Sequence, residues 1–114
     1  MTIKKFEDLI VWQKSGKMTL EIYDNFRNCR DFGFRDQIQR ASVSIMNNIA
    51  EGFERKGNKE FKRFLYIAKG SCGEVRSMIY LAYKLSYLSL DEFKKISSYS
   101  NEITKMLGSF IKKL

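Results

Sequence analysis

The sequence predicts an all-α fold, an antiparallel up-down-up-down four-helix bundle, from three observations. The chain has no proline and only seven glycines, so strands and long loops have little room to form. Apolar and charged residues alternate at helical spacing along nearly the whole chain. The periodic segments are joined by short connections, which favour consecutive helices that run in opposite directions. Residues 1–114 are therefore expected to form one domain, because a chain of this length buries a single core.

The first two predicted helices each carry a clear apolar stripe. The first runs from about Glu7 to Arg27 and ends at the irregular segment NCRDFG. Its expected core stripe contains Leu9, Trp12, Gly16, Leu20, Tyr23 and Phe26. The second runs from about Phe34 to Arg55. Its expected core stripe contains Ile38, Ala41, Ser42, Ile45, Asn48, Ile49 and Gly52.

The last two predicted helices are delimited by capping signals. The third opens with Asn58 as its expected N-cap and continues to about Ser86. Its stripe contains Phe61, Phe64, Leu65, Ala68, Cys72, Val75, Met78, Ile79, Ala82 and Leu85. The fourth starts at Ser89, which has capping-box spacing to Glu92. Its stripe contains Phe93, Ile96, Ser100, Ile103, Leu107, Phe110 and Leu114.

The predicted helices carry more apolar side chains than one bundle needs. Further stripes contain Val11, Met18 and Ile22 on the first helix, Val43, Met46, Ala50 and Phe53 on the second, and Tyr66, Gly73, Tyr80, Tyr83 and Tyr87 on the third. A tight bundle with half-exposed tyrosines is one explanation, and self-association is the other, since large exposed apolar stripes usually mark interfaces. The candidate oligomer interface comprises Val11, Met18, Ile22, Val43, Met46, Phe53, Tyr80 and Tyr83.

The formal net charge of +8 is concentrated locally. Residues 55–69 hold six basic side chains against one glutamate, a local balance of +5. In the predicted topology both termini join this segment at one end of the bundle. The candidate nucleic-acid-binding residues are Lys4, Lys5, Arg55, Lys56, Lys59, Lys62, Arg63, Lys112 and Lys113. A solvated face is the alternative, and no sequence-specific recognition motif is visible, so binding would depend on phosphates.

Catalytic and metal chemistry find little support in the sequence. There is no histidine, and the two cysteines, Cys29 and Cys72, lack the spacing of metal ligands, so no metal site or cofactor is expected. Arg40 and Glu51 lie about 16 Å apart along a helix, and Glu51 with Arg55 has the spacing of an ordinary helical ion pair. No apolar run is long enough to span a membrane, and we expect a cytoplasmic location.

Several segments together resemble a known family. They are FEDLIVWQKS, DQIQRASVSIMNNIAEGFERKGNKEFKRFLYIAKGSCGEV, a tyrosine-containing turn, and the final ITKMLGSFIKKL. This order closely resembles the four-helix-bundle family encoded in intervening sequences of large-subunit ribosomal RNA genes. It is also similar to the accessory variability determinant of diversity-generating retroelements, a basic pentamer that binds nucleic acid and a reverse transcriptase. The motif residues are Gln37, Arg40, Asn48, Glu51 and Gly52.

The resemblance implies a ring-like homopentamer with no established enzymatic activity. Met46 stands where family members often carry proline, so any kink in this helix would be weaker here. We expect Asn48 to hydrogen-bond to an adjacent helix and fix the register, and Gly52 to allow a close helix approach. The favoured function is non-enzymatic, with RNA or DNA bound non-specifically at the basic end. The alternative is an adaptor that binds a protein partner, such as a reverse transcriptase, through apolar and tyrosine stripes, and an enzyme is the least favoured class.

Overall fold

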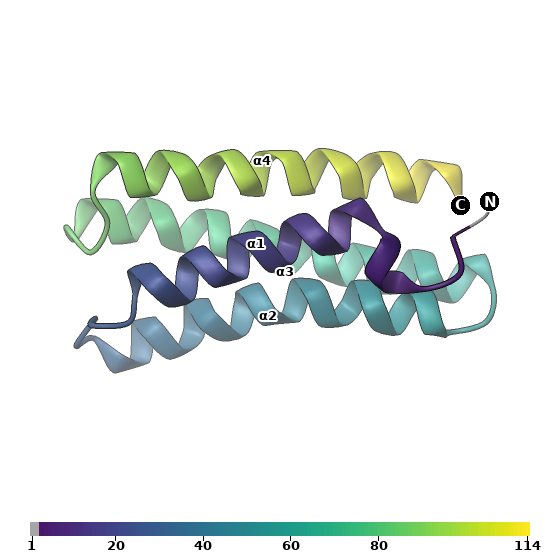
Figure 1. Cartoon of the computed structure of the whole chain (residues 1–114), viewed down its shortest axis with the longest axis horizontal. Coiled ribbons are helices and arrows are strands. Elements are labelled where there is room, and N and C mark those ends of the chain that lie inside the picture. The colour runs from purple at the N-terminus through teal and green to yellow at the C-terminus, as the bar shows by residue number, and fades with distance from the viewer. Residues whose placement is uncertain (1–2) are drawn as a thin grey trace.

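The computed structural model describes residues 3–114 as four α-helices preceded by one short 3-10 helix. The elements are η1 (Phe6–Asp8), α1 (Ile10–Asn25), α2 (Phe32–Glu54), α3 (Asn58–Lys84) and α4 (Leu90–Lys113). Figure 1 shows the four helices lying alongside one another, with the α1–α2 and α3–α4 connections at one end. The α2–α3 connection and both ends of the chain lie at the other. The all-α prediction is confirmed for residues 3–114, which contain no strand.

Local capping explains where the helices begin. The capping box of α4 is confirmed, because Ser89 Oγ accepts from the Glu92 amide at 3.1 Å and Glu92 Oε1 accepts from the Ser89 amide at 2.8 Å. Helix α2 begins two residues before the predicted position, because Asp31 caps it by accepting the Phe34 amide at 3.2 Å. Asn58 is the first residue of α3 and not its N-cap. Gly57, at a φ of 95°, takes the N-cap position.

The buried face of α1 differs from the predicted one. Leu20 and Tyr23, expected in the core, are 69% and 42% exposed. The core is formed instead by Val11, Met18 and Ile22, which were assigned to a second, exposed stripe and are at most 4% exposed. The helix is thus rotated relative to the prediction, and these three side chains have almost no surface left to offer another chain.

Small hydroxyl residues account for this rotation of α1. Ser15 and Thr19 are buried, and their hydroxyls donate to the carbonyls of Val11 and Ser15 at 2.7 and 2.8 Å. Thr19 Oγ1 also lies 3.4 Å from the carbonyl oxygen of Ser42 on α2. Because these hydroxyls are satisfied, their burial carries no penalty for an unpaired polar group, and their small size lets the two helices pack closely.

The stripes predicted for α2, α3 and α4 supply most of the remaining core. Fully buried members include Ile38, Ile45, Ile49, Leu65, Ala68, Cys72, Val75, Ile96, Ile103 and Leu107. Leu85 is the main exception, since it follows the end of α3 and is 45% exposed. Among the described residues, none of the helices is long and apolar enough to cross a lipid bilayer.

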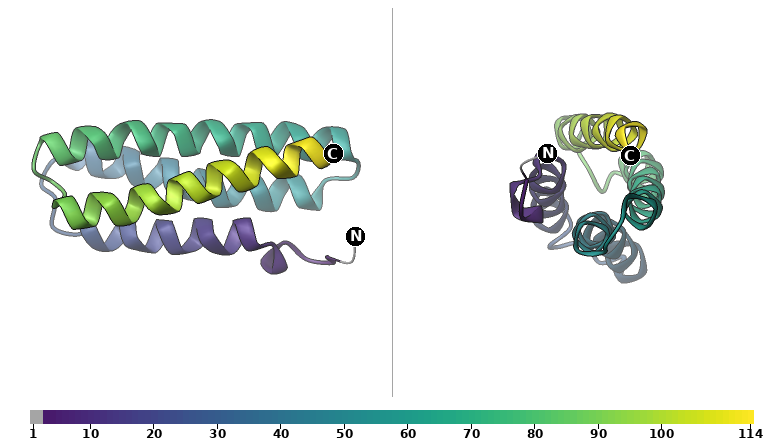
Figure 2. Two further views of the ribbon diagram at one scale, coloured as in Figure 1. Left: turned by 90° about the horizontal axis from the view of Figure 1, so that it is seen from above. Right: turned by 90° about the vertical axis from the view of Figure 1, so that its right-hand side faces the viewer.

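The helices are also joined by polar contacts. Helices α2 and α3 form the most extensively packed pair. Helices α1 and α4 are linked by two ion pairs, Lys14 with Glu102 at 2.5 Å and Lys95 with Glu21 at 2.6 Å. The end view in Figure 2 shows the four helices arranged around a common centre. Each helix therefore contributes to one shared core.

Candidate nucleic-acid interface

Three segments of the chain bring basic side chains to one end of the molecule. They are the N-terminal segment, the region around the α2–α3 connection, and the last turn of α4 (Figure 1). We call this set the basic end; it comprises Lys4, Lys5, Arg55, Lys56, Lys59, Lys62, Arg63, Lys112 and Lys113. All are exposed except Lys62, which is half-buried. Residues distant in sequence thus share one surface region.

The two arginines of the basic end are held in place by carboxylates. Arg55 Nη2 lies 2.8 Å from Glu51 Oε2, the helical ion pair that its spacing predicted. Glu60 links the two guanidinium groups, at 3.9 Å from Arg55 and 2.9 Å from Arg63. The hydrogen bond from Arg63 lowers the pKa of Glu60, and the same bond raises the pKa of Arg63. Both arginines are therefore partly neutralised within the chain.

Phe64 adds a second constraint on the same arginines. Its ring lies 5.1 Å from the guanidinium carbon of Arg55 and 4.6 Å from that of Arg63, distances typical of cation–π contacts. The ring is 6% exposed, because it packs between α2 and α3. Sequence analysis assigned Phe64 only to the core stripe. Its position between the two helices makes it a platform for the basic end as well.

The lysines of the basic end are in a different state from the arginines. Within residues 3–114, none of them forms an ion pair with a carboxylate. They are Lys4, Lys5, Lys56, Lys59, Lys62, Lys112 and Lys113. The lysines thus supply the uncompensated positive charge here, while the arginines supply fixed, partly compensated charge.

Gly52 determines how closely α2 approaches α3 beside this surface. A Cβ at this position would lie 2.7 Å from Phe64 Cβ and 3.0 Å from Phe61 Cδ1. Real Cβ atoms do not approach another carbon at 2.7 Å, and Phe64 Cβ cannot move away by side-chain rotation. The prediction that Gly52 permits a close helix approach is confirmed.

The contacts of Asn48 correct the role expected for it. Its Nδ2 donates to the Ser44 carbonyl oxygen at 2.8 Å and to Ser44 Oγ at 3.0 Å, both within α2. The expected direct bond to an adjacent helix is absent from the described contacts. The link to α3 is made by Ser44 itself, whose Oγ lies 2.9 Å from Ser71 Oγ. Asn48 is only half-buried, so its amide remains near the edge of the core and its own helix can satisfy it.

The remaining motif residues occupy the polar face of α2. Gln37 Nε2 donates to Glu74 Oε2 on α3, so this face forms contacts to α3 near both ends of α2. Arg40 is exposed and forms no ion pair within residues 3–114. It lies about 16 Å from Glu51 along the helix axis, so the two do not form a joint site.

The candidate interface residues do not form one continuous surface. Val11, Met18 and Ile22 are buried in the core of the chain, as described above, and are removed from the interface. Val43, Met46, Phe53 and Tyr83 are half-buried, and Tyr80 is 57% exposed. The methyl group of Met46 would lie 3.3 Å from a Cβ at Gly16 of α1.

Aromatic contacts within the chain further separate these residues. The Phe53 ring packs against Phe61 at 5.9 Å. Tyr80 and Tyr83 flank Phe93 at 5.1 and 5.3 Å. The proposed interface residues thus lie on several separate parts of the bundle.

The cysteines have structural environments. Both are free thiols, and Cys72 is fully buried, with its Sγ 3.5 Å from the Ser100 carbonyl oxygen and 3.4 Å from Thr104 Oγ1. Burial raises the pKa of the Cys72 thiol, which keeps it protonated. The part of the chain from residue 3 onward contains no cluster of three or more side chains suited to hold a metal ion.

Comparison with known proteins gives two similarities. A family model described as 23S rRNA-intervening sequence protein matches residues 7–109. A crystal structure of a protein of unknown function from the S23 ribosomal protein family of Bacteroides thetaiotaomicron VPI-5482 is 28% identical, with a TM-score of 0.85. The alignment covers 90% of this chain and 99% of that chain. No match is found among curated proteins.

Proposed function

The chain belongs to the 23S rRNA-intervening sequence protein family, and from this premise we propose that it is a non-enzymatic nucleic-acid-binding protein. In this proposal the antiparallel up-down-up-down bundle assembles into a homo-oligomer. The oligomer binds RNA or DNA through its basic end, with little preference for sequence. The family resemblance favours a homopentamer.

The observation that carries the proposal is the convergence of unpaired lysines from three segments at one end of the bundle (Figure 1). Exposed lysines without carboxylate partners attract polyanions, and the phosphate backbone is the polyanion that rewards a diffuse surface. The described residues contain no feature that reads base edges, such as a helix-turn-helix. Affinity should therefore come from phosphate contacts, summed over the subunits of the oligomer.

The arginines would contribute differently from the lysines. Arg55 and Arg63 are held over Phe64 and bridged by Glu60, so a phosphate that reached them would compete with existing ion pairs. The lysines release counterions to solvent without breaking such contacts. We expect the lysines to determine most of the salt dependence of binding.

Self-association is supported by exposed aromatic side chains on α3. Tyr66 and Tyr80 are 56% and 57% exposed, with Ile67 and Leu81 beside them at 41% and 50% exposure. Large exposed apolar side chains on one helix are typical of interfaces. The same surface supports the alternative function of an adaptor that binds another protein. Light scattering distinguishes the two, since the adaptor reading predicts a 13.4 kDa monomer in the absence of a partner.

Salt-dependent binding to a single-stranded and a structured RNA tests the nucleic-acid proposal. The variant Lys56→Gln/Lys59→Gln should weaken binding to both RNAs and flatten the plot of log affinity against log salt by about 1.4–1.8. The matched control Lys84→Gln/Lys94→Gln lies at the other end of the bundle and should change the slope little. Equal losses from both variants, or no binding by the wild type at low salt, would contradict the proposal.

A further inference from the structure

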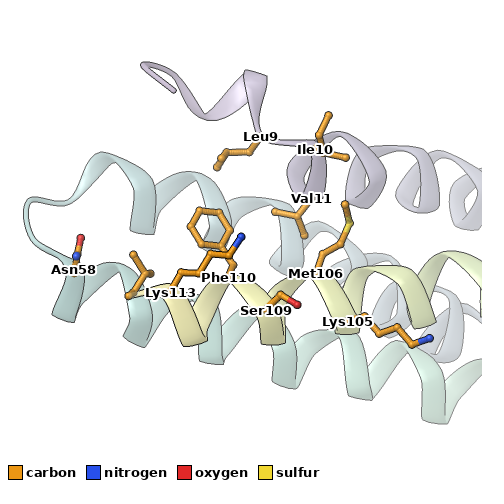
Figure 3. Close-up of a pocket in the computed structure, with 10 residues that line it drawn as sticks. Leu9, Ile10, Val11, Asn58, Lys105, Met106, Ser109, Phe110 and Lys113 are labelled. Carbon is orange, nitrogen blue, oxygen red and sulfur yellow. The ribbon is translucent and has the colours of Figure 1, made fainter. Parts of the chain in front are cut away.

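An apolar groove lies between the start of α1 and the end of α4, near the basic end. It has a volume of about 860 Å³ and is lined by the residues drawn in Figure 3. Leu9 and Val11, which are at most 4% exposed, line it on the α1 side. Met106 and Phe110 of α4 line the opposite side. Sequence analysis did not identify this groove.

The groove exists because α4 extends beyond the start of α1. Lys14 pairs with Glu102, so Ile10, one turn earlier in α1, lies level with Met106, one turn later in α4. Beyond this level α1 is replaced by η1, and Leu9 between them has extended backbone angles. The last turns of α4 are consequently left without a full helical partner, and their apolar side chains are only partly covered.

The rim of the groove carries positive charge and no negative charge. Lys105 and Lys113 line it along α4, and Ser109 lies between them (Figure 3). Neither lysine forms an ion pair within residues 3–114, and no acidic residue lines the groove. Ile10 adds an apolar rim side chain that is 53% exposed. An occupant would therefore combine an apolar face with acidic flanks.

We propose that this groove binds an amphipathic helix of a partner protein, with apolar residues in the groove and acidic residues opposite Lys105 and Lys113. The two lysines are eight residues apart on α4, a separation of about 12 Å along the axis. Apolar residues at positions i, i+3 and i+7 of a docked helix span about 10.5 Å, which fits between the lysines. The groove is open to solvent along one side, which suits a helix better than a small molecule that must be enclosed.

Titration with two labelled synthetic peptides tests this inference. Both carry leucines at i, i+3 and i+7 of an alanine-rich helix, and they differ only in having glutamates or lysines at the flanks. The glutamate peptide should bind, with amide NMR shifts concentrated at the groove residues, and the lysine peptide should bind about tenfold or more weakly. The variant Ile10→Gln/Met106→Gln should weaken the glutamate peptide by about tenfold or more. The exposed-site control Leu81→Gln should stay within about twofold of the wild type.

Distinct outcomes would overturn the inference. One is equal affinity for both peptides, or equal losses in the groove variant and the Leu81→Gln control. Another is no binding at about 1 mM of the glutamate peptide. If Ile10→Gln/Met106→Gln breaks the oligomer but leaves peptide affinity unchanged, the groove belongs to a second copy of the chain. Groove shifts caused by dodecanoate and not by the peptide would assign it to a lipid. Because the groove substitutions are neutral, RNA affinity should remain unchanged, so this test stands apart from the proposed function.

Discussion

Replacing Gly52 by alanine should force α2 and α3 apart. The new Cβ would lie 2.7 Å from Phe64 Cβ, whereas ordinary contacts between such atoms begin at 3.4 Å. The Phe64 Cβ is attached to the backbone, so the conflict can be relieved only by moving a helix. Overpacking of this kind costs about 1–3 kcal/mol. Alanine favours a helix over glycine by about 1 kcal/mol, so the net loss of stability should be about 0–2 kcal/mol.

A matched substitution separates the steric cost from helix propensity. Gly108 lies inside α4, and a Cβ there would have no neighbour within 4 Å. Gly108→Ala should therefore stabilise the protein by about 1 kcal/mol. Since both variants gain the same propensity term, the difference between their free energies of unfolding isolates the steric cost, about 1–3 kcal/mol. Urea denaturation followed by circular dichroism at one protein concentration measures it, and a Gly52→Ala variant as stable as Gly108→Ala would refute the reasoning.

Three further predictions concern polar and ionisable groups. Ser71→Ala removes the hydroxyl that bonds to Ser44 and should destabilise the protein by about 0.5–1.5 kcal/mol in the same denaturation assay, whereas no loss would show that this contact is dispensable. Because the hydrogen bond from a neighbouring arginine lowers the pKa of Glu60 below its ordinary value of 4.5, stability should fall as the pH drops below that value, and Glu60→Gln should lessen the fall seen in acid titrations. Iodoacetamide should modify Cys29 but not the buried Cys72 in the folded protein, and mass spectrometry that finds both labelled at equal rates would contradict the structure.

The sequence by itself determined where the helices form and which faces of α2, α3 and α4 are buried. Long apolar stripes at helical spacing leave one way to hide their side chains, and local signals such as the capping box at Ser89 act through neighbouring residues alone. Gly52 was also predictable, because a glycine on the buried face of a helix indicates close backbone approach. The gathering of basic residues followed from helix count and short connections.

Only the tertiary structure decided which face of α1 points inward. That helix has two apolar stripes, and the choice depended on whether Ser15 and Thr19 could satisfy their hydroxyls within the helix and let α2 pack close. Asn48 likewise had acceptors on its own helix as well as on its neighbour. The groove beside Ile10 depends on the relative lengths and heights of α1 and α4 in space. Such features arise from how separate helices meet, and residue spacing within a single helix carries no information about that.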